Sequence, residues 1–178
     1  METKKMSTRE LCYIGMFVAI IAVCAQISIP LPGGVPFTLQ TWAISLAGVM
    51  LGTKKGTIAT VIYVLLGAIG IPVFANFAGG LSIVFGPTGG FILSFPIMAL
   101  LAGIGGEKKH ILWLVSGLVA GTIINFLVGM IQFSFVLSTN LQAAFMTAVF
   151  PFLLSAVIRI IFITAVGKRM KKIVFHIN

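Results

Sequence analysis

The chain has 178 residues, of which 59% are hydrophobic and only 8% are charged, whereas soluble domains carry roughly a quarter of charged residues. This composition excludes a soluble catalytic domain and predicts one all-α, polytopic membrane domain over residues 1–178, surrounded by membrane lipid. The formal charge of +9 comes from basic residues scattered as short pairs beside apolar runs, which favours a role in membrane topology and argues against nucleic-acid binding.

Apolar runs separated by charge pairs and turn signals predict six transmembrane helices. Their approximate ranges are 11–29, 39–52, 57–71, 89–105, 111–135 and 143–167. The second and third runs are short for a bilayer crossing. We therefore expect neighbouring helices to shield them in part, or the membrane boundary to tilt near them.

The positions of the basic residues predict how these helices are oriented. With six spans, eleven of the twelve fall on one side: Lys4, Lys5, Arg9, Lys54, Lys55, Lys108, Lys109, Lys168, Arg169, Lys171 and Lys172. The connections on the other side, 30–38, 72–88 and 136–142, contain no charged residue. The positive-inside rule then predicts that both termini lie in the cytoplasm.

Small residues form a stripe along the first span. Gly15, Ala19 and Ala22 recur at helical spacing, which lets another helix approach closely. Two interpretations stay open for this stripe. It serves packing inside the bundle, or it docks a separate membrane partner.

Arg159 lies inside the last predicted span, and the residues around it are uncharged. The three acidic residues, Glu2, Glu10 and Glu107, all fall at the cytoplasmic edge. A cation at membrane depth is costly unless water, carbonyl groups or an anion meets it. We therefore predict that Arg159 grips the carboxylate of a ligand at two points. The alternative is that water or backbone carbonyls freed by Pro151 satisfy the guanidinium.

Neutral polar groups and aromatic rings gather in the outer half of the predicted bundle. Together with one fixed cation they describe a pocket for a small, partly apolar carboxylic acid, although any one of them alone is better explained by helix packing. The polar group comprises Gln26, Ser28, Thr38, Gln40, Thr41, Asn76, Ser82, Thr88, Asn125 and Gln132. The aromatic group comprises Phe37, Trp42, Phe74, Phe77, Phe85 and Phe91.

Several chemistries are disfavoured by what the sequence lacks. It contains no P-loop motif, so energy for uphill transport has to come from another subunit. His110 and His176 flank the cytoplasmic ends, which disfavours a proton relay at membrane depth. An intramembrane enzyme is disfavoured because Cys12 and Cys24 have no histidine at their depth to act as a base. We expect no metal or cofactor site.

Three motifs in chain order resemble the BioY family, the biotin-binding S components of energy-coupling factor transporters. They are Val35-Pro-Phe-Thr-Leu-Gln-Thr41, Gly67-Ala-Ile-Gly-Ile-Pro-Val-Phe74 and Gly86-Pro-Thr-Gly-Gly90. The resemblance extends over essentially the whole chain. It implies a six-helix bundle in a prokaryotic plasma membrane, with an outward-facing vitamin site under the loop between the first two helices. It also implies coupling to a transmembrane T component and two ATPase subunits, with the Gly15 and Ala19 face as the docking surface.

Two positions depart from the pattern of that family. The segment from Pro151 to Arg159 keeps the basic residue, but Ala156 stands where the family usually has aspartate, and Phe91 stands where it usually has tyrosine. The missing polar groups leave lipoate or a biotin precursor open as alternatives to biotin. Gln40, Asn76 and Asn125 are the candidates to supply the missing acceptor. A membrane subunit with a purely structural role is a further alternative.

Overall fold

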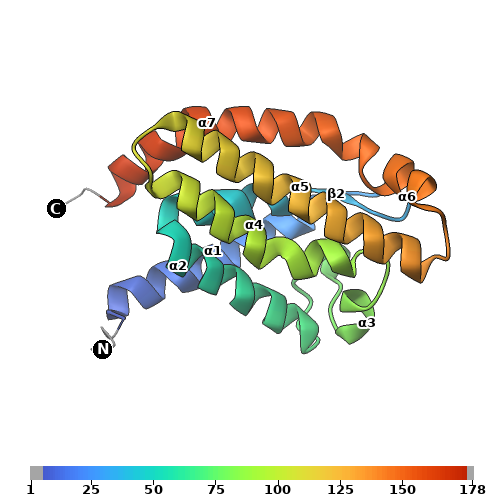
Figure 1. The fold of residues 1–178 in the computed structure, drawn as a ribbon. Helices are drawn as coiled ribbons and strands as arrows, with labels where there is room; N and C mark the ends of the chain where they lie inside the picture. Colours follow the sequence, from blue (N-terminus) through green and yellow to red (C-terminus); the bar gives the residue numbers. More distant parts are fainter. Residues whose placement is uncertain (1–5, 176–178) are drawn as a thin grey trace, which may run out of the picture.

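The computed structural model describes residues 6–175 and consists almost entirely of helices (Figure 1). Glu2, Lys4, Lys5 and His176 lie outside the described residues. The elements in chain order are α1 (Thr8–Gln26), β1 (Ser28–Ile29), β2 (Phe37–Thr38), α2 (Gln40–Ala68), η1 (Ala75–Phe77), α3 (Leu81–Val84), α4 (Gly89–Glu107), α5 (Ile111–Val136), α6 (Leu141–Ala148), η2 (Phe150–Phe152) and α7 (Leu153–Phe175). The short strands β1 and β2 pair antiparallel. The predicted all-α membrane fold is confirmed.

The first helix begins at a capping box. Ser7 Oγ accepts a hydrogen bond from the Glu10 backbone N–H at 3.3 Å, and the Glu10 carboxylate accepts one from the Ser7 N–H at 2.9 Å. This reciprocal pair satisfies two of the backbone donors that a helix start leaves open. The same carboxylate forms an ion pair with Lys55 Nζ at 2.7 Å, which ties the start of α1 to α2.

The α2 element folds back on itself at Gly52. Gln40 Nε2 donates a hydrogen bond to Tyr63 Oη at 2.7 Å across 23 residues, whereas in a continuous helix that separation spans about 34 Å. Residues 40–51 and 53–68 therefore run in opposite directions and correspond to the predicted spans 39–52 and 57–71. Five helical segments are long and apolar enough to cross a membrane, and because α2 is folded in two they agree with the six predicted spans.

Glycine makes this reversal possible. Gly52 has φ 81° and ψ 176°, a backbone conformation that residues other than glycine avoid. A Cβ on Gly52 would lie 2.6 Å from Glu107 Oε1, and that same oxygen accepts a hydrogen bond from the Thr53 N–H at 2.7 Å. Glu107 thus caps the returning half of α2. Beyond the turn, a Cβ on Gly56 would come within 2.7 Å of the Gly48 Cα, so the two halves meet backbone to backbone.

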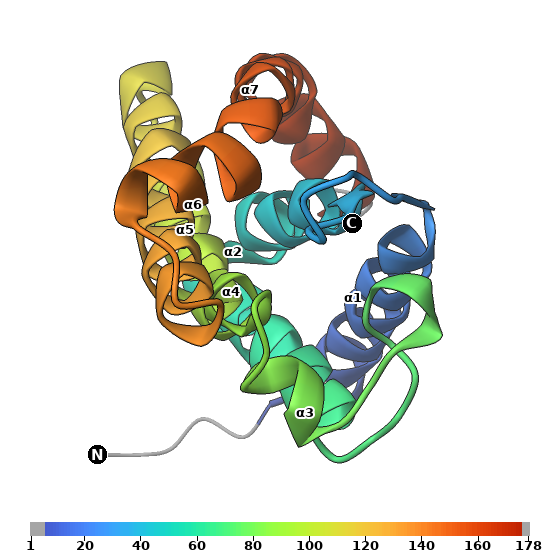
Figure 2. The same cartoon turned by 90° about the vertical axis from the view of Figure 1, so that its right-hand side faces the viewer.

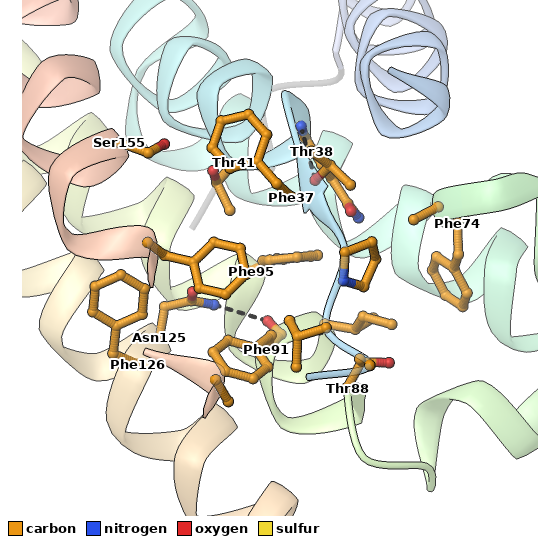
Figure 3. Close-up of a pocket in the computed structure, with 18 of the residues that line it drawn as sticks. Phe37, Thr38, Thr41, Phe74, Thr88, Phe91, Phe95, Asn125, Phe126 and Ser155 are labelled. Atoms are coloured by element: carbon orange, nitrogen blue, oxygen red, sulfur yellow. Dashed lines mark hydrogen bonds between the residues drawn. The ribbon is translucent and has the colours of Figure 1, made fainter. Parts of the chain in front are cut away.

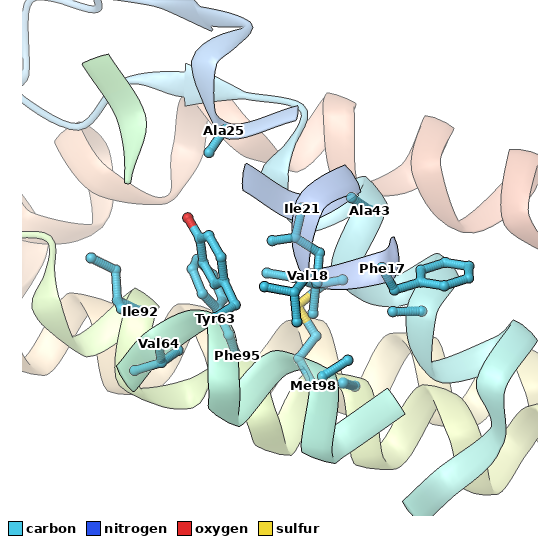
Figure 4. Packing of buried hydrophobic residues seen from close by; sticks show 14 of the residues in the cluster. Phe17, Val18, Ile21, Ala25, Ala43, Tyr63, Val64, Ile92, Phe95 and Met98 are labelled. Carbon is cyan, nitrogen blue, oxygen red and sulfur yellow. The ribbon is translucent and has the colours of Figure 1, made fainter. Parts of the chain in front are cut away.

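The α4 helix forms the centre of the bundle, with its most extensive contacts to α2 and α5. Figure 2 shows it between α5 on one side and the two halves of α2 on the other. The main core cluster joins α1, α2 and α4, with Ile21, Tyr63, Phe95 and Met98 packed together (Figure 4). This packing leaves the end of the bundle near the β1–β2 connection to be filled by loops.

The last predicted span, 143–167, is interrupted near its N-terminal end. The apolar segment from Leu141 to Gly167 contains α6, one turn of 3₁₀-helix around Pro151, and the first part of α7. Proline has no N–H to donate and clashes with a preceding α-helical turn, which explains the break. The break places α6 across the end of the bundle that holds the β1–β2 connection (Figure 1).

The two ends of the bundle differ in charge. The start of α1, the reversal of α2 with Lys54 and Lys55, and the α4–α5 connection with Lys108 and Lys109 lie at one end. The β1–β2 hairpin, η1, α3 and α6 lie at the other (Figure 1). The cytoplasmic location of the basic end stays a prediction.

We expect Gly52→Ala to lower the melting temperature of the detergent-solubilised chain, because the Cβ meets Glu107 and the backbone conformation is strained. We expect the free energy of unfolding to fall by about 1–3 kcal/mol. Gly34→Ala is the matched control, since Gly34 also has a positive φ, of 78°, but nothing lies within 4 Å of its Cβ position. Equal losses in the two variants would contradict the role given to the Glu107 contact.

Candidate functional site

A cavity of about 270 Å³ lies at the uncharged end of the bundle (Figure 3). Its walls come from the β1–β2 connection, the start of α2, the segment around η1, and from α4, α5 and α7. The cavity brings together all seven residues predicted to bind substrate: Thr38, Gln40, Asn76, Thr88, Phe91, Asn125 and Arg159. Their shared location agrees with the prediction of one pocket, and their contact with a ligand stays a prediction.

Arg159 is buried at the wall of this cavity, with 4% of its surface exposed. One of its terminal nitrogens, Nη2, donates a hydrogen bond to Thr122 Oγ1 at 2.7 Å, and the Thr122 hydroxyl in turn donates to the Leu118 carbonyl. Arg159 Nε is buried and has no partner among the described residues. Among residues 6–175, no carboxylate accepts a hydrogen bond from this guanidinium, and neither does any carbonyl near Pro151.

This arrangement leaves most of the hydrogen-bonding capacity of the guanidinium unused. The group carries five N–H donors, and a neutral hydroxyl cannot balance its charge. Water or an anion in the cavity would stabilise a buried cation in such surroundings. Backbone carbonyls freed by Pro151 were the alternative partner for Arg159. Among the described residues, none of them accepts a hydrogen bond from its guanidinium.

Asn125 of α5 presents an acceptor in the wall of the cavity. Its Nδ2 donates to the Phe91 carbonyl at 2.9 Å and to Ser94 Oγ at 2.8 Å (Figure 3 draws the first of these bonds). The bond to Phe91 fixes the orientation of the amide, because a carbonyl can only accept and would repel the amide oxygen if the group were reversed. Asn125 Oδ1 accepts no hydrogen bond from the described residues, so it remains available to an N–H donor in the cavity.

Aromatic rings supply the apolar part of the wall. Phe37 of β2 stacks on Phe152 of η2, with centroids 6.4 Å apart and an interplanar angle of 7°. Phe91 and Phe95 of α4 face the cavity with Phe126 of α5 (Figure 3). Such rings suit the hydrocarbon portion of a ligand.

The loop between β1 and β2 forms the roof. At its tip, Gly33 packs so closely on Thr147 of α6 that any Cβ at position 33 would overlap the threonine methyl group. The roof loop therefore contacts α6, and Ala148 at the end of α6 also lines the cavity.

Part of the wider polar and aromatic set lies away from the cavity. Gln132 donates from Nε2 to the carbonyls of Val84 and Gly86 at 2.9 Å each, and so anchors the Gly86–Gly90 motif on α5. The residues that do not line the cavity are Gln26, Ser28, Ser82, Gln132, Trp42, Phe77 and Phe85.

Sequence reasoning missed several residues of the wall and their support. Thr122, the partner of Arg159, lies three residues before Asn125 on α5, so helical spacing from Asn125 would have pointed to it. Phe95, Phe126, Phe152 and Ser155 also line the cavity. Ala156 lines it as well, so the position that usually carries aspartate in the family faces the cavity here with a methyl group.

The model of the BioY family matches residues 1–176 of the chain. The chain is 40% identical over 166 residues to the biotin transporter BioY of Thermotoga maritima, covering 93% of this chain and 97% of that protein. It is 37% identical over 166 residues to the probable biotin transporter BioY of Pyrococcus horikoshii, covering 93% and 98%. A crystal structure of the S-component for biotin from an ECF-type ABC transporter matches with a TM-score of 0.83 at 26% identity, covering 94% of this chain and 95% of the other.

Proposed function

Since the chain belongs to the BioY family, we propose that it is the substrate-binding S component of an energy-coupling factor transporter and that it captures biotin from outside a prokaryotic cell. The observation that carries this proposal is the nearly full-length relationship to biotin transporters. The chain is a transport protein and not an enzyme. Lipoate and biotin precursors are the alternative ligands, because Ala156 and Phe91 remove polar groups from the cavity wall.

The chemistry of the cavity fits biotin, which combines a carboxylate, an apolar tail and a ureido ring with two N–H donors. In our proposal Arg159 binds the carboxylate, because the cavity wall offers no other cation among the described residues. Asn125 Oδ1 accepts a hydrogen bond from a ureido N–H in place of the missing aspartate. The other polar residues proposed to contact the ligand are Thr38, Gln40, Asn76 and Thr88. Phe91 belongs to the apolar part of the wall. The aromatic rings contact the tail and the thioether ring.

We also propose coupling to a T component and two ATPase subunits, with docking on α1. The inward face of α1 consists of Ile14, Phe17, Val18, Ile21 and Ala25. Gly15 and Ala19 are exposed, Ala22 is half-buried, and nothing lies within 4 Å of the Cβ position of Gly15. Packing inside the bundle therefore does not use Gly15 and Ala19, which supports the docking interpretation of the stripe.

We expect the purified chain to bind biotin and Arg159→Ala to lose most of that affinity, because a charge-assisted pair contributes roughly 1.5–3 kcal/mol or more when buried. Equilibrium binding of biotin and of biotin amide, which lacks the charge, separates the possible roles of the arginine. If Arg159 holds the carboxylate, the wild type prefers biotin over the amide and Arg159→Ala does not. A wild type that binds both ligands equally would contradict this role, and a wild type that binds neither would contradict the proposed function.

Asn125→Leu is expected to weaken biotin binding by roughly tenfold, because one ureido N–H loses its acceptor. Lipoate has no ureido group, so any lipoate affinity should stay unchanged. Ser94→Ala is the matched control, since it removes one bond that orients Asn125 but leaves Oδ1 in the cavity. An equal loss for both ligands in Asn125→Leu would contradict the acceptor role.

The roof loop is expected to open for ligand entry. A Cβ on Gly33 would lie 3.6 Å from the Thr147 Cβ, within the range of about 3.5–4.5 Å that a disulfide requires. In a background of Cys12→Ser and Cys24→Ser, we expect oxidised Gly33→Cys/Thr147→Cys protein to exclude biotin and the reduced protein to bind it. Thr147→Cys alone is the control. Equal binding rates for oxidised and reduced protein would contradict opening at this contact.

A further inference from the structure

Gln26 does not line the cavity, yet its side chain is bound to a segment that does. From the last turn of α1, its Nε2 donates to the Phe74 carbonyl at 3.0 Å, to the Val73 carbonyl at 3.3 Å and to the Ala22 carbonyl at 3.1 Å. Its Oε1 accepts from the Phe77 N–H at 2.8 Å. One amide thus bridges α1 to three residues between positions 73 and 77. Phe74 and Asn76 of this segment line the cavity.

The segment from 73 to 77 has a strained backbone that needs such support. Asn76 has φ 59° and ψ 36°, and Phe77 has φ 55°, so two successive residues without the freedom of glycine adopt the left-handed region. The Phe77 side chain is 71% exposed, so burial against the rest of the chain contributes little to holding it. A hydrogen bond from the Phe74 N–H to the Ala78 carbonyl closes the segment on itself. The side chain of Gln26 binds the segment from α1.

A second contact on the same segment comes from α2. The Tyr63 hydroxyl donates to the Val73 carbonyl at 2.9 Å and accepts from Gln40 Nε2, a residue of the cavity wall. The Val73 carbonyl therefore receives hydrogen bonds from α1 and α2 at once. Because Tyr63 is fully buried and its ring meets Phe74 edge-on at 5.7 Å, this side of the segment is rigidly fixed. Gln26 holds the other side, where Asn76 and Phe77 lie.

We propose that Gln26 is a positioning residue for substrate binding. Its amide holds residues 73–77 in the conformation that presents Phe74 and Asn76 to the cavity, and it acts through this segment without touching the ligand. The proposal rests on the proposed function, because biotin is the ligand used to measure it. When a binding-competent conformation is only partly populated, apparent affinity falls by that fraction, so loss of Gln26 lowers affinity by depopulating the competent segment.

Gln26→Leu removes every hydrogen bond of this amide at similar volume. We expect its dissociation constant for biotin to rise roughly tenfold, since several hydrogen bonds that preorganise the segment are lost. Hydrogen exchange of the ligand-free protein should become faster at the Phe77 amide, whose acceptor is gone, and biotin should slow it again. Ser134→Ala is the matched control, because it removes a hydrogen bond to the Thr139 carbonyl in an outer loop outside the cavity.

A second pair of variants keeps the test independent of folding defects. Phe77→Asn replaces a residue that resists the left-handed region with one that tolerates it, so it should restore part of the affinity lost in Gln26→Leu. Gln26→Glu keeps an acceptor for the Phe77 N–H but turns a carboxylate oxygen towards the carbonyls of Val73 and Phe74, so it should weaken biotin binding at least as much as Gln26→Leu. It takes the place of Gln26→Leu if that variant does not fold.

Two results would overturn the proposal. The first is an unchanged dissociation constant in folded Gln26→Leu or Gln26→Glu. The second is a weakened affinity with unchanged exchange at Phe77, which would mean that Gln26 acts by another route. A wild type that binds no biotin would overturn the proposed function instead, and the exchange measurement would still decide whether Gln26 holds the segment.

Discussion

The reversal of α2 at Gly52 is the constraint on which the shape of the cavity depends. Because the helix turns back, Gln40 at its start and Tyr63 near its end lie in hydrogen-bonding contact at the same end of the bundle. One of them lines the cavity and the other supports the backbone of the segment that carries Phe74. Glycines at the turn and between the halves make this possible, and Glu107 supplies the cap that the returning half lacks.

The cavity combines one buried cation with neutral support. Arg159 is anchored by a hydroxyl, so its position is fixed while its charge stays uncompensated by the described residues. Asn125 shows the same division, since its Nδ2 donates hydrogen bonds to α4 while its Oδ1 accepts none from the described residues. In both residues, one part of the side chain binds the protein and the other part has no partner among the described residues. Such preorganisation reduces the entropy lost on binding.

The sequence was sufficient to predict the six spans, the basic end and the seven polar or aromatic residues around one cavity, because hydropathy and charge report position along the membrane normal. It was not sufficient to separate residues that line the cavity from those that hold its walls. Gln26 and Gln132 look like pocket residues by depth, but their partners lie about fifty positions away in the chain. Only tertiary packing decides which backbone carbonyl meets each amide. The break before α7 shows the same limit, since Pro151 lies within an unbroken apolar run.

The buried guanidinium also has an electrical consequence for a carrier. In the proposed function, a carboxylate bound to Arg159 would leave the occupied site close to neutral, and a reorientation of that site towards the cytoplasm would move little net charge. After release of the ligand, the empty site would keep its cation. An inside-negative membrane potential opposes the outward return of such a charge by about 2.3 kcal/mol per 100 mV when the full potential is crossed. The loaded and empty halves of such a transport cycle would therefore differ in their sensitivity to voltage.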